Sequence, residues 1–517
     1  MSSVPSSQAQ GALFELVARG VKDKYFLGET KESEFIYDAS YSPSLPHLGE
    51  RRTIVPVNGT AFGTTFDVEI EPYGDVLTEC ALEIQMPTWF PPLPLGGGAG
   101  AGGASGCIAP SVVNGLYPIT SVAGGESYGY VNGMGYFLFE KIQWYQDQIL
   151  IQEWSGDGLL AKQLTEGSYH HGALRLSQGG WQDTVERTAV RNLQLRATPG
   201  MLRVHLPLPG LQSPMDTGLP LVAMTWQTLR LRVTLRTLEE LVVCSDTGVL
   251  SPAPWNVPAF TYTDTENGGA VRTVEPLRRP DIGAPTVLLA MVQRYVSPEA
   301  QQKMRSERFE IPFRRMYENR FSFGELNYIQ LDKGGTAAVT KRLEGRHPTE
   351  RLMWLFRLQE NMDKGRLDDW RNPYFETHPT TETQPLTWPD GGFYYRLKLL
   401  IAGRDREYLE SGTTWDVIAP WAKAERVSGS GGFGGGSGLG VMDWGLGDQV
   451  GVRYPTERVP TGTVNFSMAD RPTLYLELSN VPSHPVRAER VVEMRVWSEA
   501  WGVYVVEEGR GRAMFAS

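Results

Sequence analysis

Short segments in which apolar and polar residues alternate recur along this chain. In residues 230–236, leucine or valine takes every second position, with arginine or threonine between them. A period of two is typical of β-strands with one buried face, because successive side chains point to opposite sides of a sheet. The same pattern occurs in segments 66–71, 82–86, 202–206, 395–399, 474–478 and 492–496. These repeats predict an all-β fold built from antiparallel sheets.

Turn chemistry supports this prediction. Among 517 residues there are 57 glycines and 35 prolines, and both residue types favour tight turns and loops. Helical signals are few. Residues 297–304 begin with a serine cap, a proline at the first helical position and an early glutamate, which predicts one short helix. A second short helix is expected over 159–164.

The predicted helix at 297 separates two strand-rich halves, and the length of the chain requires more than one core. We therefore divide the chain into an N-terminal arm (1–30), a first sandwich (31–296), a linker helix (297–307) and a second sandwich (308–517). Long excursions interrupt these halves. They are rich in Gly, Pro, Ser or Thr and cover residues 87–128, 245–285, 372–390 and 429–440.

Charge and cysteine content exclude several functions. The net charge is −10, whereas a surface that grips phosphate backbones is basic, so no direct nucleic-acid contact is expected. Three cysteines, far apart in the sequence, do not form a disulfide framework. No secretory signal or membrane-spanning stretch is evident. We expect a product that stays in the cytoplasm.

Several motifs resemble a known family. Residues 460–467 read PTGTVNFS, residues 400–406 read LIAGRDR, residues 347–354 read HPTERLMW and residues 206–209 read LPLP. In this order they resemble segments of the major capsid proteins of the nucleocytoplasmic large DNA viruses, the group with chlorella viruses, iridoviruses and African swine fever virus. The likeness covers nearly the whole chain. The glycine-rich insertions and the excursion at 245–285 depart from the family pattern.

The resemblance implies a double jelly roll, that is, two tandem eight-stranded antiparallel jelly rolls with long loops between strands and few short helices. It further implies a structural protein of an icosahedral virion capsid, assembled in the host cell cytoplasm. Three chains would form a homotrimeric, pseudo-hexagonal capsomer that contacts neighbouring capsomers and minor capsid proteins. The excursion at 87–128 would then be an outward loop.

The N-terminal arm has two interpretations. Leu13, Leu16 and Val17 fall on one helical face, with Phe14 beside them. This face could contact a neighbouring subunit or the inner viral membrane. Alternatively, it packs on its own subunit.

No residue is expected to be catalytic, to bind a cofactor or to ligate a metal. Residues 429–434 satisfy GxGxxG, but the run continues as glycine and serine without a following helix, so a loop is expected. The neighbours His170 and His171 lack the spacing of metal ligands. Asn58 and Asn465 stand in glycosylation sequons. We expect both to be unmodified because no secretory signal is evident, although sugars added by virus-encoded enzymes remain an alternative.

Two other functions stay open from the sequence. One is a minor capsid or penton-like paralogue with the same fold, which would be present in few copies per particle. The other is a carbohydrate-active β-sandwich enzyme, which would need a cleft with two carboxylates at catalytic separation. No such pair can be assigned from the sequence.

Overall fold

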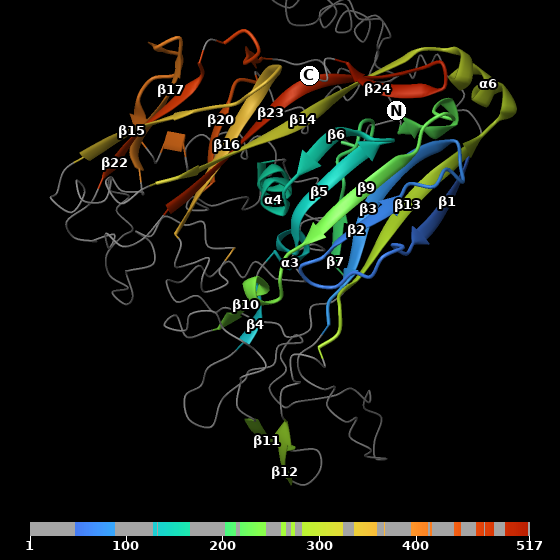
Figure 1. Ribbon diagram of the computed structural model, residues 1–517, viewed down its shortest axis with the longest axis horizontal. Helices are drawn as coiled ribbons and strands as arrows, with labels where there is room; N and C mark the ends of the chain where they lie inside the picture. The colour runs from blue at the N-terminus through green and yellow to red at the C-terminus, as the bar shows by residue number, and fades with distance from the viewer. Residues whose placement is uncertain are drawn as a thin grey trace, which may run out of the picture. The chain divides into compact units, whose positions relative to one another are not determined.

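The architecture comes from a computed structural model of the chain (Figure 1). It describes residues 47–87, 128–131, 133–165, 202–212, 218–244, 260–264, 270–274, 282–323, 336–358, 367, 394–411, 414–415, 439–445, 462–469, 471–479 and 492–514. The N-terminal arm, His170, His171 and the run 429–434 lie outside these ranges.

Two antiparallel sheets form the N-terminal half. The first sheet has the strand order β1 (His47–Ile54), β13 (Thr286–Val296), β3 (Val76–Gln85) and β7 (Leu202–His205), and β8 (Leu219–Pro220) also pairs with β3. The second sheet has the order β2 (Thr65–Glu69), β9 (Leu229–Leu235), β5 (Phe139–Gln146) and β6 (Ile149–Trp154). We call these sheets the β1 sheet and the β2 sheet.

The predicted alternation sets which side chains enter the core. Phe66 and Val68 of β2 are buried, as are Leu231 and Val233 of β9, and all four belong to one apolar cluster. Arg232, between the two β9 residues, points to the opposite face, where it pairs with Asp67. The prediction of strands with one buried face is confirmed for this sheet.

The C-terminal half repeats this arrangement. One sheet has the order β14 (Phe309–Ser322), β23 (Val492–Glu507), β16 (Pro348–Leu358) and β20 (Leu439–Asp443), joined by β21 (Val464–Asn465) and β24 (Arg510–Met514). The other has the order β15 (Thr336–Arg342), β22 (Thr473–Ser479), β17 (Tyr394–Ile401) and β18 (Arg404–Asp405), joined by β19 (Glu410–Ser411). We call them the β14 sheet and the β15 sheet. Each half thus has two antiparallel sheets, and each sheet contains a continuous row of four strands. This arrangement confirms the predicted pair of eight-stranded antiparallel units.

The β14 sheet is buried on both faces. Trp354 and Val496 point into the core of the C-terminal half. Their neighbours Met353 and Trp497 belong instead to the large apolar cluster that contains the core of the N-terminal half. Both faces of this sheet are therefore covered by apolar side chains, and one of them is covered by the other half of the chain.

Helices are short, as expected. α6 (Pro298–Ser306) joins the two halves in sequence, and the Ser297 hydroxyl accepts a hydrogen bond from the Ala300 amide at 3.4 Å. The second predicted helix is α4 (Gly156–Thr165), which follows β6. α3 (Met134–Phe137) precedes β5. Within the described ranges, no helix has the length and apolar character that crossing a bilayer requires.

One excursion contains structure that the sequence did not predict. Within the expected loop 245–285, β11 (Phe260–Asp264) pairs with β12 (Ala270–Val274) as an antiparallel hairpin (Figure 1). Nearby in sequence, β10 (Val242–Cys244) pairs with β4 (Tyr128–Tyr130). Alternating Thr and aromatic residues in 260–264 were a signal for this hairpin that the high Pro and Asn content of the segment obscured.

Candidate functional site at the contact between the two halves

Helix α4 brings the N-terminal half against the β14 sheet. The Ser155 hydroxyl accepts a hydrogen bond from the Gly158 amide at 3.1 Å, which satisfies a free N–H at the start of the helix. Gly158 faces the other half: a Cβ atom there would lie 2.7 Å from Trp497 Nε1 and 2.9 Å from Met316 Sδ. Only glycine allows this close approach of the helix backbone to the sheet.

Asp157, in the first turn of α4, lies at the centre of a buried ionic cluster. Its carboxylate accepts hydrogen bonds from Arg236 at 2.7 Å, from Arg495 at 2.6 Å and from Arg357. Asp157 and Arg357 are fully buried. Arg236 directly follows β9 in the N-terminal half, whereas Arg357 and Arg495 stand on β16 and β23. One carboxylate thus joins cations from both halves.

The electrostatics of this cluster favour the charged form of Asp157, whereas burial lowers the pKa of Arg357. Burial alone would raise the pKa of Asp157, but the attraction of Arg357, Arg495 and Arg236 outweighs it and holds this pKa well below its usual range. Arg495 also pairs with Glu493 at 3.0 Å. Charges out of water are stabilised only by such close partners, so each ion depends on the others.

A second ionic cluster lies at the other end of α4. Lys162 pairs with Glu499 of β23. On the same sheet, Arg351 lies 3.8 Å from Glu499 and 3.2 Å from Asp443. Lys162 and Glu499 are both almost fully buried. The helix therefore makes a charged contact with the β14 sheet near each of its ends.

Polar contacts to backbone groups fix the register between the halves. The Gln212 side chain accepts from the Arg314 amide at 2.7 Å and donates to the Arg314 carbonyl at 2.8 Å. Gln152 donates to the Met316 carbonyl at 2.7 Å, and Arg315 donates to the Ile151 carbonyl at 2.9 Å. These contacts can form together only when the β14 sheet has one defined position relative to the N-terminal half. They therefore make the two halves one structural block.

Acid should weaken this contact through Glu499. Burial alone would raise the pKa of Glu499, but Lys162, Arg314 and Arg351 lower it from 4.5 to about 2. Since the pKa is depressed in the folded state, the stabilisation is complete above pH 4.5 and is lost as the pH falls towards 2. We expect the free energy of unfolding, measured in urea, to fall over this window. Glu499→Gln should flatten the slope, and an unchanged slope in this variant would contradict the assignment.

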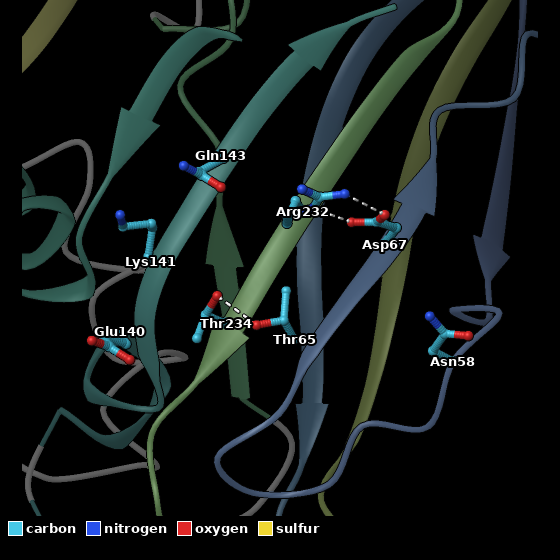
Figure 2. Close-up of a pocket in the computed structure, with 8 residues that line it drawn as sticks. All are labelled: Asn58, Thr65, Asp67, Glu140, Lys141, Gln143, Arg232 and Thr234. Carbon is cyan, nitrogen blue, oxygen red and sulfur yellow. Dashed lines mark hydrogen bonds and ion pairs between the residues drawn. The ribbon is translucent and has the colours of Figure 1, made fainter. Parts of the chain in front are cut away.

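A polar hollow lies on the outer face of the β2 sheet (Figure 2). Its volume is about 510 Å³, and it is lined by Asn58, Thr65, Asp67, Glu140, Lys141, Gln143, Arg232 and Thr234. The polar groups engage one another: Arg232 donates to both Asp67 oxygens, at 2.9 and 3.1 Å, and the Thr65 and Thr234 hydroxyls lie 3.0 Å apart.

The Asp67 carboxylate in this hollow does not suit acid catalysis. The hydrogen bond from Arg232 is the main reason that the pKa of Asp67 is lowered, so this group stays ionised. A glycosidase acid needs the opposite shift. Among the described residues, no group of His, Cys, Asp or Glu has the arrangement of a metal site.

None of the α4 contacts described above involves either of the two sequon asparagines. Asn58 is exposed and lines the polar hollow. Asn465 is exposed on β21, where its side-chain oxygen accepts from the Ser467 amide at 3.0 Å. Their expected lack of modification stays a prediction.

The residues of the α4 contact were missed in the sequence. The signal that could have found them is the segment 352–358, an almost unbroken apolar run that contains Arg357. A continuous apolar strand indicates burial on both faces. An arginine within it then requires a buried acid elsewhere.

Comparisons with known proteins concern the sequence and the fold of the chain. No family model matches the chain. It is 30% identical over 120 residues to a major capsid protein of Phaeocystis pouchetii virus, a match that covers 23% of this chain and 20% of that protein. The chain therefore spans about a fifth of the length of the curated relative.

Two solved structures share the fold over nearly the entire chain. The capsid of PBCV-1 virus covers 93% of this chain and all of that chain, with a TM-score of 0.60 at 15% identity. The Faustovirus major capsid protein covers 97% of both chains, with a TM-score of 0.53 at 12% identity. The resemblance seen in the motifs is confirmed, and the fold is a double jelly roll.

Proposed function

We propose that this chain, which has the double jelly-roll fold seen in capsid proteins of large DNA viruses, is a structural shell protein of such a virus. The observation that carries the proposal is the buried α4 contact, which makes two similar sandwiches one rigid block. A block of this kind suits the role of a building unit. In the polar hollow, Arg232 holds the Asp67 carboxylate in its ionised form.

The proposed assembly is a homotrimer. Each chain supplies two similar sandwiches, so three chains supply six and can fill a pseudo-hexagonal position in an icosahedral shell. Closed rings with repeated contacts are the usual form of such assemblies. Closed sandwiches suit a protein stored at high concentration, because they leave few strand edges open to aggregation. We place this assembly in the host cytoplasm, with minor capsid proteins as further partners.

The test is the mass of the purified protein in solution. Size-exclusion chromatography with light scattering should give three times the chain mass of 57.5 kDa, and negative-stain electron microscopy should show particles of hexagonal outline. A stable monomer over the micromolar range would contradict the proposal. A trimer that occurs in only a few copies per purified virion would assign the minor-capsid role instead.

A further inference from the structure

Two buried arginines of the ionic cluster at the start of α4 share one carboxylate. Among the described residues, Arg236 and Arg357 form ion pairs only with Asp157. The same carboxylate also bonds to Arg495, which reaches two further glutamates at 3.0 and 3.7 Å. The Arg357 side chain is fully buried and that of Arg236 is 7% exposed, so bulk water does not screen them. Their positive charge therefore exceeds the negative charge beside them.

Three N–H groups of these two arginines have no acceptor. Nε and Nη1 of Arg357 and Nε of Arg236 are buried and find no hydrogen-bond partner in the described part of the chain. Nη2 of Arg357, by contrast, donates to Asp157 and to the Leu367 carbonyl. The Phe137 ring, whose centroid lies 5.7 Å from the Arg357 guanidinium carbon, attracts the charge but offers no acceptor atom. Buried donors of a charged group are costly when they stay unpaired, so they require an acceptor from elsewhere.

The surroundings favour a negative ion as this acceptor over water. Burial lowers the pKa of Arg357 although Asp157 attracts its charge, which means that one shared carboxylate does not compensate the guanidinium. A water molecule would accept a hydrogen bond but would add no charge. The start of α4 lies beside the cluster, and the free N–H groups of a helix N-terminus carry a positive partial charge of their own.

The packing limits the size of such an ion. Phe137, Asp157 and Arg357 are all fully buried, and Gly158 lets the α4 backbone approach the β14 sheet closely. Protein interiors are close-packed, with few spaces larger than a water molecule. A halide ion is about as large as a water molecule, whereas phosphate or sulfate would need four oxygens to be accommodated.

We propose that the α4 contact holds a halide ion, which is chloride in ordinary solutions, on the unpaired N–H side of Arg357 and in the field of Arg236. Arg357 stands on β16 of the C-terminal half, and Arg236 follows β9 of the N-terminal half. The ion therefore belongs to the contact between the halves and stabilises it. A ligand that binds only the folded chain raises its stability with the logarithm of the ligand concentration.

The first experiment measures the melting temperature of the full chain by calorimetry as chloride replaces gluconate at constant ionic strength. Gluconate is too large for the site. Arg357→Met keeps an apolar stem and removes the donors, while Asp157 retains its other two arginines. The matched control is Arg232→Met, which removes the arginine that pairs with Asp67 on the outer face of the β2 sheet (Figure 2).

We expect the wild type and Arg232→Met to melt about 2 °C higher when chloride rises from its dissociation constant to about a hundred times that value. The melting temperature of Arg357→Met should not respond to this exchange. The same response in Arg357→Met as in the wild type would overturn the proposal, and so would a wild type that does not respond.

The second experiment needs no variant and decides the question if Arg357→Met does not fold. Crystals of the wild type are grown with bromide in place of chloride, and anomalous diffraction locates the bromide ions. We expect an anomalous peak within hydrogen-bond distance of Arg357 Nε or Nη1. Ordinary water density at this place, without anomalous signal, would show that water is the acceptor and would overturn the halide site.

Discussion

Replacing Asp157 with asparagine is expected to lower the free energy of unfolding by about 3–5 kcal/mol, because the change leaves buried cations without their shared partner. Asparagine keeps the shape of the side chain and one oxygen acceptor. It removes the negative charge that Arg236, Arg357 and Arg495 surround. Arg357 is fully buried and pairs with no other carboxylate in the described part of the chain. The loss should appear in urea unfolding and in calorimetry.

A matched control is available on the β2 sheet. Asp67 also accepts hydrogen bonds from an arginine, but this pair is about one third exposed. Exposed ion pairs contribute about 0–1 kcal/mol, so Asp67→Asn should change stability by no more than that. If Asp157→Asn were as mild as Asp67→Asn, the α4 contact would not be what holds the two halves together.

The sequence predicted most of the strands, because a strand that is buried on one face has apolar residues at every second position. β2, β7, β9, β17 and β22 lie where the alternation placed them. β1 was missed: its residues 47–54 are mostly polar and carry no alternation, since an edge strand with an open face needs few apolar side chains. Its place in the sheet comes from pairing with β13, a contact that spans the whole N-terminal half.

The contact between the halves could not be predicted in the same way. The alternation in 492–496 indicates that Arg495 faces solvent, yet Arg495 is 3% exposed and bonds to Asp157. That interpretation was wrong because alternation shows only that the two faces of a strand differ in polarity. It does not show whether another part of the chain covers the polar face. Asp157 itself stands in a Gly-Asp-Gly segment that is typical of a turn. Its partners on β16 and β23 are 200 and 338 residues away.

A double-mutant cycle on Lys162 and Glu499 should give a coupling free energy of about 1–3 kcal/mol. This value lies in the upper part of the range that is typical of residues in direct contact. Lys162→Met alone removes the cation that pairs directly with the buried Glu499 carboxylate and leaves Arg314 and Arg351 near it, so we expect a loss of about 3 kcal/mol. Glu499→Gln alone removes the carboxylate that pairs with the buried Lys162 ammonium and should cost a similar amount. The double variant removes both charges, so its loss should be smaller than the sum of the two single losses.

The cycle also tests whether the halves act as one block. Lys162 belongs to α4 and Glu499 to β23, so their coupling is measured across the contact and not within either core. The matched cycle uses Lys141 and Glu153, a pair 3.2 Å apart whose side chains are about 40% exposed and lie within the β2 sheet. Its coupling should not exceed about 1 kcal/mol. Equal couplings in the two cycles would mean that the Lys162–Glu499 pair is exposed to water in solution. The α4 contact would then not hold the two sandwiches in one fixed arrangement, which filling two positions of a pseudo-hexagonal ring requires.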